Sequence, residues 1–125
     1  MKILLSIAVL FLLLLSGCYY DSQEYLYPQL NTQCDTTNVT FTTSVQPVMQ
    51  SYCLSCHSNT SAGALGGNIK LENYADLKIY ADNGILYKVV SHDPSVPAMP
   101  LGANKLDNCT LAVIKKWVDA GAPNN

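Results

Sequence analysis

The chain has 125 residues, enough for one small domain. It has seven lysines, no arginine and nine carboxylates, a balance that argues against a nucleic-acid-binding protein, because phosphates require a dense basic surface. A chain of this size buries only a modest core, so a cofactor or covalent cross-links would help it to fold.

The amino-terminal end predicts a secretory signal. Lys2 precedes an almost unbroken apolar run from Ile3 to Leu15. The run is too short to cross a hydrocarbon layer of ~30 Å comfortably, and it matches the ~7–15-residue apolar centre of a signal peptide. We therefore expect residues 1–17 to be removed on export.

The sequence Leu15-Ser16-Gly17-Cys18 resembles the lipobox of bacterial lipoproteins. The resemblance implies cleavage before Cys18 and acylation of that cysteine, which would anchor the protein to a bacterial membrane, on the periplasmic side or in the outer membrane. Residues 18–33 are polar and tyrosine-rich, without helical or strand periodicity. We expect them to be a tether that keeps the following domain near the lipid bilayer.

Residues 34–125 predict one all-α domain with long loops. Thr43 or Ser44 can cap a first helix that runs to about Tyr52. Pro47 is acceptable in the first turn, where amide donors lack partners. Apolar residues at a spacing of three and four define one face of this helix: Val45, Val48, Met49 and Tyr52.

Three further helices are predicted. Asn73 can cap a helix over residues 74–82 that stops at Asn83-Gly84, and a short helix covers 85–90. Asp107 or Asn108 opens the last helix, which Gly121 and Pro123 end. Its apolar stripe consists of Leu111, Ile114, Trp117 and Val118. Residues 58–68 and 91–104 are rich in loop-forming residues and predict loops.

Two of the five cysteines belong to the motif Cys53-Leu54-Ser55-Cys56-His57. This spacing is the attachment signature of c-type haem. Two intervening residues let both thiols add to neighbouring vinyl groups of the porphyrin, and His57 then lies beneath the ring, where its imidazole can bind iron. The sequence therefore predicts one covalent haem c.

Three other interpretations of this motif remain open. A thioredoxin-like redox pair has the same spacing, but it requires a strand before the helix, and no strand pattern precedes Cys53. A zinc site needs four ligands, which only Cys34, Cys109 and His92 could complete. A simple disulfide within the motif would leave His57 without a role.

Cys34 and Cys109 are the cysteines left over after lipidation and haem attachment. In an oxidising compartment two such thiols are expected to pair. The sequence therefore predicts a Cys34–Cys109 disulfide that closes a long loop around the haem motif.

From about Val39 to Pro123 the chain resembles a class I cytochrome c. The features that match are the haem motif, Met99 within Pro97-Ala98-Met99-Pro100, and the terminal helix with Trp117. The resemblance implies that the first and last helices cross near the haem edge. The arginine-free composition departs from mitochondrial relatives with a basic docking surface, so their partners do not carry over.

Met99 is the favoured second axial ligand, since the prolines at 97 and 100 stiffen its loop. His92 is the rival ligand, and an open or water-bound position is a third possibility. Met49 lies on the apolar face of the first predicted helix and is expected to be a core residue.

The predicted function is a membrane-anchored carrier of single electrons, or an electron-entry subunit, that exchanges electrons with redox partner proteins in or near the membrane. We expect no substrate turnover of its own. Two alternatives are a haem enzyme or gas sensor with an open sixth iron position, and a haem-free, disulfide-stabilised lipoprotein that binds another ligand.

Overall fold

The regular structure of residues 34–125 is entirely helical, as the sequence predicts. These are the residues that the computed structural model describes, and they belong to one unit, Thr32–Asn125. The predicted signal peptide, the lipidation site at Cys18 and the tether lie outside the described residues. No helix in the described part is long and apolar enough to cross a membrane.

The first helical segment begins earlier than predicted. A π-helical turn, η1 (Phe41–Val45), leads directly into α3 (Gln46–Tyr52). Thr40, and not Thr43 or Ser44, is the capping residue, because its backbone is extended and its hydroxyl accepts the Thr43 N–H. A regular α-helix would bring the ring of Pro47 against the carbonyl four residues earlier, and the wider π-helical turn lies at that point.

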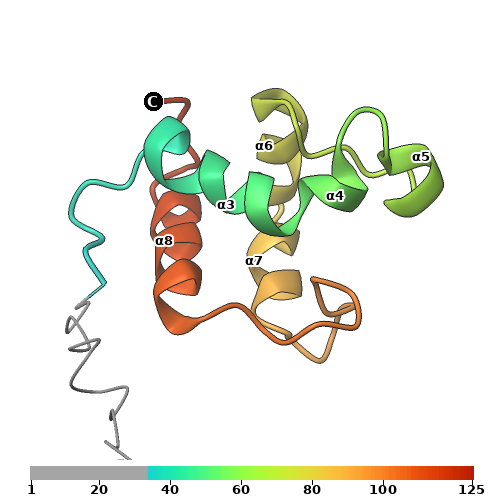
Figure 1. The fold of residues 1–125 in the computed structure, drawn as a ribbon. Helices are drawn as coiled ribbons and strands as arrows, with labels where there is room; N and C mark the ends of the chain where they lie inside the picture. Colours follow the sequence, from blue (N-terminus) through green and yellow to red (C-terminus); the bar gives the residue numbers. More distant parts are fainter. Residues whose placement is uncertain (1–33) are drawn as a thin grey trace, which may run out of the picture. The chain divides into compact units, whose positions relative to one another are not determined.

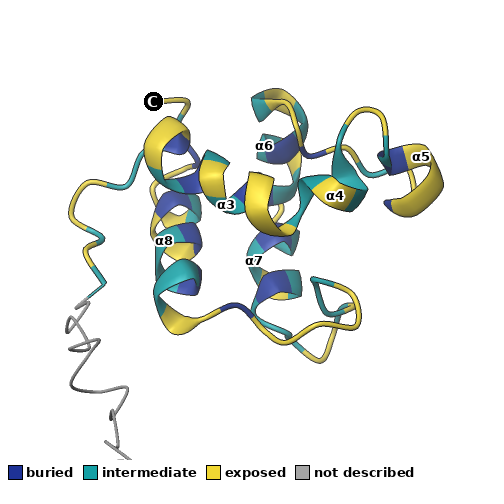
Figure 2. Cartoon of the chain, viewed as in Figure 1, coloured by how far each residue is buried: buried dark blue, intermediate teal, exposed yellow. Residues whose placement is uncertain are grey.

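The haem motif follows on α4 (Leu54–His57), immediately after α3. The predicted loop over residues 58–68 is partly wrong, because it contains the short helix α5 (Ala62–Leu65). The small residues Ala62, Gly63 and Ala64 permit a tight helical turn whose one buried residue is Ala62. Figure 2 shows that the other positions of α5 are exposed.

The remaining helices agree with the predictions: α6 (Tyr74–Asp82), α7 (Ile85–Val90) and α8 (Asn108–Asp119). Asp107 caps α8 through hydrogen bonds from the N–H groups of Cys109 and Thr110. Asn73 is the N-cap residue of α6, as predicted, but its side chain accepts no backbone N–H and its amide donates to the Asp76 carboxylate instead. Residues 91–104 contain no regular secondary structure.

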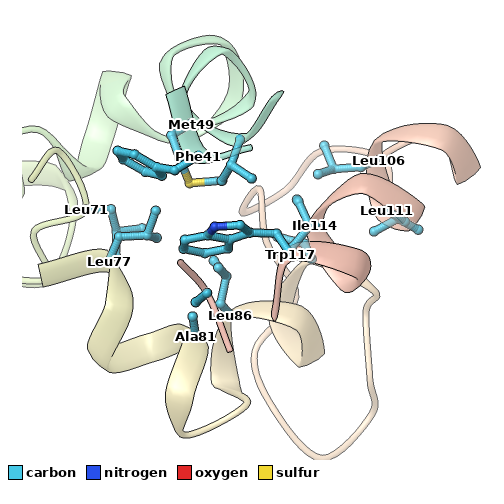
Figure 3. Packing of buried hydrophobic residues seen from close by; sticks show 13 residues of the cluster. Phe41, Met49, Leu71, Leu77, Ala81, Leu86, Leu106, Leu111, Ile114 and Trp117 are labelled. Atoms are coloured by element: carbon cyan, nitrogen blue, oxygen red, sulfur yellow. The ribbon is translucent and has the colours of Figure 1, made fainter. Parts of the chain in front are cut away.

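Trp117 lies at the centre of the hydrophobic core, between residues of η1 and α3 on one side and α6 and α7 on the other (Figure 3). Its ring stacks on Phe41 with centroids 5.8 Å apart, and its indole N–H donates to the Pro123 carbonyl at 2.9 Å. Met49 is 1% exposed, as expected of a core residue. The first and last helical segments therefore pack together through this tryptophan, and Figure 1 shows α8 beside η1 and α3.

Covalent and polar contacts fasten the two ends of the described residues to this core. The structure joins Cys34 and Cys109 in a disulfide, the pairing that the sequence predicts. At the other end, the Asn125 side chain accepts the Phe41 N–H at 2.8 Å, and the Tyr74 hydroxyl donates to the Ala122 carbonyl at 2.7 Å. The start of the domain is thereby held to both α8 and the carboxyl terminus.

Candidate functional site

A largely apolar cavity of about 550 Å³ opens between the α3–α4 segment, residues 65–71, α7 and the loop that contains Met99. Cys53, Cys56, His57 and Met99 all line it, so the structure brings together the four residues that the sequence selects for haem. None of the described residues that line the cavity is charged. Its volume lies within the range of ~300–1,000 Å³ that is typical of cofactor sites.

The two free thiols of the motif stand on one helical turn. The carbonyl of Cys53 accepts the N–H groups of Cys56 and His57 at 3.2 and 2.9 Å, which closes the turn that begins α4. Residues three positions apart are neighbours on a helical surface. Both cysteines therefore face the same cavity, as attachment to adjacent groups of one cofactor requires.

The electrostatics of Cys53 argue against a thioredoxin-like redox pair. Burial raises the pKa of the Cys53 thiol from its ordinary value of 9.0 to about 11. A redox-active cysteine of that class needs a lowered pKa, because the thiolate is the attacking species. Cys53 stays protonated at neutral pH, and no strand leads into α4 in the described residues.

The imidazole of His57 is oriented by a main-chain contact. Its Nδ1 lies 2.9 Å from the carbonyl oxygen of Ile69. A carbonyl only accepts hydrogen bonds, so the proton of the neutral ring sits on Nδ1 and Nε2 is left with a free lone pair. Histidines that bind a metal through one ring nitrogen commonly donate the other ring N–H to a backbone carbonyl, as His57 does here.

Gly66 packs directly against the haem motif. A Cβ atom at this position would lie 2.5 Å from the Cys56 carbonyl oxygen and 2.8 Å from Nδ1 of His57. The backbone of Gly66 has φ −105°, which any residue can adopt. Glycine is therefore needed here for space and not for conformation, and it allows residues 66–69 to approach the His57 ring.

Met99 reaches the cavity from the loop after α7. Its backbone N–H donates to the Val89 carbonyl at 2.9 Å. Met99 and His57 line both the main cavity and a smaller apolar cavity of about 80 Å³. The structure thus brings a thioether and an imidazole, 42 positions apart in the chain (99 minus 57), to the walls of one apolar space.

The rival ligands are placed elsewhere. His92 does not line the cavity, and its Nε2 lies 3.1 Å from the carbonyl oxygen of Met99. Cys34 and Cys109 are bonded to each other, which leaves them unable to complete a zinc site with the motif. Residues 34–125 contain no group of three or more His, Cys, Asp or Glu side chains suited to a metal ion.

Two contributors to the site were not predicted from the sequence. The Ile69 carbonyl orients His57 through its backbone, which no residue type encodes. Gly66 lies in a stretch where glycine also predicts a loop, and its consecutive pairing with Gly67 is the one signal that points to a special position.

Tyr52 was expected in the apolar face of the first helix, but it is 45% exposed and lines the cavity.

No protein-family model, curated protein or solved structure matches the chain.

The close approach of Gly66 to His57 generates a stability prediction. We expect Gly66→Ala to lower the free energy of unfolding by about 1–3 kcal/mol, the usual cost of forcing an atom into a packed site. Urea unfolding followed by circular dichroism measures the change.

Gly63→Ala is the matched control. Gly63 is exposed on α5, and its added Cβ would meet nothing closer than 3.7 Å. We expect this variant to be as stable as the wild type or slightly more stable, because alanine has the higher helix propensity. Equal unfolding midpoints for the two variants would contradict the steric role of Gly66.

Proposed function

We propose that the chain is a mono-haem c-type cytochrome that transfers single electrons close to a membrane. The observation that carries the proposal is the convergence of Cys53, Cys56, His57 and Met99 on one cavity. These residue types are those that attach haem c and bind its iron on both sides. The all-α domain would then resemble a class I cytochrome c wrapped around one covalent haem.

The chemistry of the site supports haem over other large ligands. Cys53 and Cys56 would supply the two thioether attachments, and His57 would bind iron through Nε2, the nitrogen that the Ile69 contact leaves free. Met99 would supply the second iron ligand. Most of the remaining wall residues are apolar, with Leu71 and Leu86 among them, as a porphyrin requires; Tyr52 and Ser55 are the polar-tipped exceptions.

The haem iron, when bound, supplies a one-electron couple. The residues of this chain would control its access and potential. A thioether from Met99 would occupy the position at which small molecules could otherwise bind iron, and together with the apolar walls it would favour the reduced state. With His57 and Met99 both committed to iron, no ligand position would be left for a substrate, so we propose electron transfer without substrate turnover.

Membrane attachment is part of the same proposal. Cleavage before Cys18 and acylation of its sulfur would leave the domain, residues 34–125, on a tether of residues 18–33. Such a tether spans at most about 53–58 Å when fully extended. Its redox partners would accordingly be proteins in or near the same membrane, on the periplasmic side or at the outer membrane.

An exposed apolar rim around the cavity supports direct protein contact. Tyr52, Leu65 and Leu101 are 45%, 67% and 81% exposed, and all three line the cavity. Ile79, the fourth large apolar side chain exposed in the described residues, does not line it. Partners would dock on this rim through apolar contact, with little dependence on charge.

The decisive experiment is a reduced-minus-oxidised visible spectrum of protein made with a haem-attachment system. We expect the bands of a c-type haem, retained under denaturing conditions because the attachment is covalent. The Cys53→Ser/Cys56→Ser variant should lose the covalent haem. A colourless wild-type protein whose two thiols are both alkylated would refute the proposal and favour a haem-free binding lipoprotein.

Substitution of Met99 tests the second ligand. Met99→Leu should abolish the near-infrared thioether–iron band of the oxidised protein and let carbon monoxide bind the reduced protein, because the sixth position becomes vacant. Met49→Leu is the control, since Met49 is a buried core methionine and leucine nearly conserves its volume. Carbon monoxide binding to the wild type would favour the open-site sensor or enzyme instead.

The rim generates a prediction about electron self-exchange, which nuclear magnetic resonance line broadening measures in half-reduced samples. We expect the wild-type rate to change by less than about twofold from low to physiological ionic strength. Leu101→Glu should slow the exchange and make it salt-dependent, because two like charges would meet at the contact. Ile79→Glu adds the same charge away from the cavity, and equal slowing by both variants would rule out the rim.

A further inference from the structure

The peptide groups of Met99 are held on both sides. Its N–H donates to the Val89 carbonyl at the end of α7, at 2.9 Å, and its carbonyl oxygen lies 3.1 Å from Nε2 of His92. The second contact joins two residues of the same loop that are seven positions apart. The residue that presents a thioether to the cavity is therefore fixed at both its amide and its carbonyl.

The direction of the His92 contact follows from chemistry. Because the Met99 carbonyl only accepts hydrogen bonds, Nε2 of His92 must donate to it. The backbone of His92 has φ +58°, a left-handed conformation in which histidine is one of the more common non-glycine residues. This conformation follows the end of α7 and turns the chain into the loop of residues 91–99.

The chain beyond Met99 offers little other support. Residues 101–105 are all exposed, and the next buried residue is Leu106. Within 100–105 the structure has one backbone hydrogen bond, from the Ala103 N–H to the Pro100 carbonyl, and it is local. Segments with few buried contacts open readily. The residues that follow Met99 therefore contribute little to holding it in place, and the His92 contact lies next to them.

We propose that His92 is a positioning residue for the sixth iron ligand: its imidazole donates a hydrogen bond to the Met99 carbonyl and so holds the thioether in the cavity. The inference rests on the proposed haem function and deepens it. It gives His92 a role other than that of the rival ligand. His92 touches the backbone of the ligand residue and none of the cavity.

Three variants separate the imidazole from the backbone conformation. His92→Gly removes the donor while adopting φ > 0 without strain. His92→Gln keeps an N–H donor at a similar reach and should rescue the function. Ser95→Ala is the loop control, because it removes a hydrogen bond to Asp93 within the same loop and leaves Met99 untouched. If His92→Gly does not fold, His92→Asn replaces it, with a shorter side chain that also tolerates φ > 0.

The measurement is the affinity of the oxidised holoprotein for free imidazole, which competes with Met99 for iron, followed through loss of the near-infrared thioether band. We expect His92→Gly to bind imidazole about tenfold more tightly than the wild type, the upper range of what one hydrogen bond contributes. His92→Gln should lie within about twofold of the wild type, as should Ser95→Ala. The His57 side of the site should be unaffected, with the covalent haem spectrum retained.

The outcomes distinguish this inference from the function on which it rests. A wild-type protein without a haem spectrum refutes the proposed function itself. A wild-type protein with haem but without the thioether band refutes Met99 as an iron ligand, and with it the role of His92. If the wild type has both the haem spectrum and the thioether band, and His92→Gly has unchanged imidazole affinity, only the positioning role of His92 is overturned. Equal shifts in His92→Gly and Ser95→Ala would show general loosening of the loop, which also overturns it.

Discussion

The hydrophobic core and the cavity share a wall, and the site depends on this wall. Leu71, Leu86, Val90 and Leu106 belong to the buried core cluster and also line the cavity. Trp117 of α8 belongs to the same core cluster and packs between residues of η1 and α3 and residues of α6 and α7 (Figure 3). Burial of these side chains drives folding, so the packing that stabilises the domain also fixes the shape of the space beside the haem motif.

The two proposed iron ligands reach the cavity by different routes. His57 follows Cys56 directly, so the turn of α4 brings it to the site together with both thiols. Met99 arrives from a loop whose position depends on α7 and on the contacts of its own backbone. The placement of the two thiols and of His57 beside them thus follows from local geometry, whereas the placement of Met99 depends on tertiary packing.

Predicted and observed helix bounds agree best where interactions within one helical turn define the ends of the helix. The helices Tyr74–Asp82, Ile85–Val90 and Asn108–Asp119 match their predicted bounds, because capping residues and glycines act within one turn. The start of the first helical segment was misplaced, since several threonines there compete for the capping position and Thr40 alone has the extended backbone. The helix α5 was missed because alanine and glycine in a polar stretch also predict a loop.

Part of the site can be predicted from residue types along the chain: two thiols and an imidazole at haem spacing, one methionine in a proline-rich loop, and two further cysteines to pair. These are patterns of residue type over short distances, which the chain encodes directly. Three contacts appear only in the folded chain. Gly66 leaves space for the His57 ring, the Ile69 carbonyl orients that ring, and His92 contacts the Met99 carbonyl. Every residue has a backbone carbonyl, so the residue type does not indicate which carbonyl meets a given side chain. Such contacts, and the space between atoms, are set only when distant segments pack together.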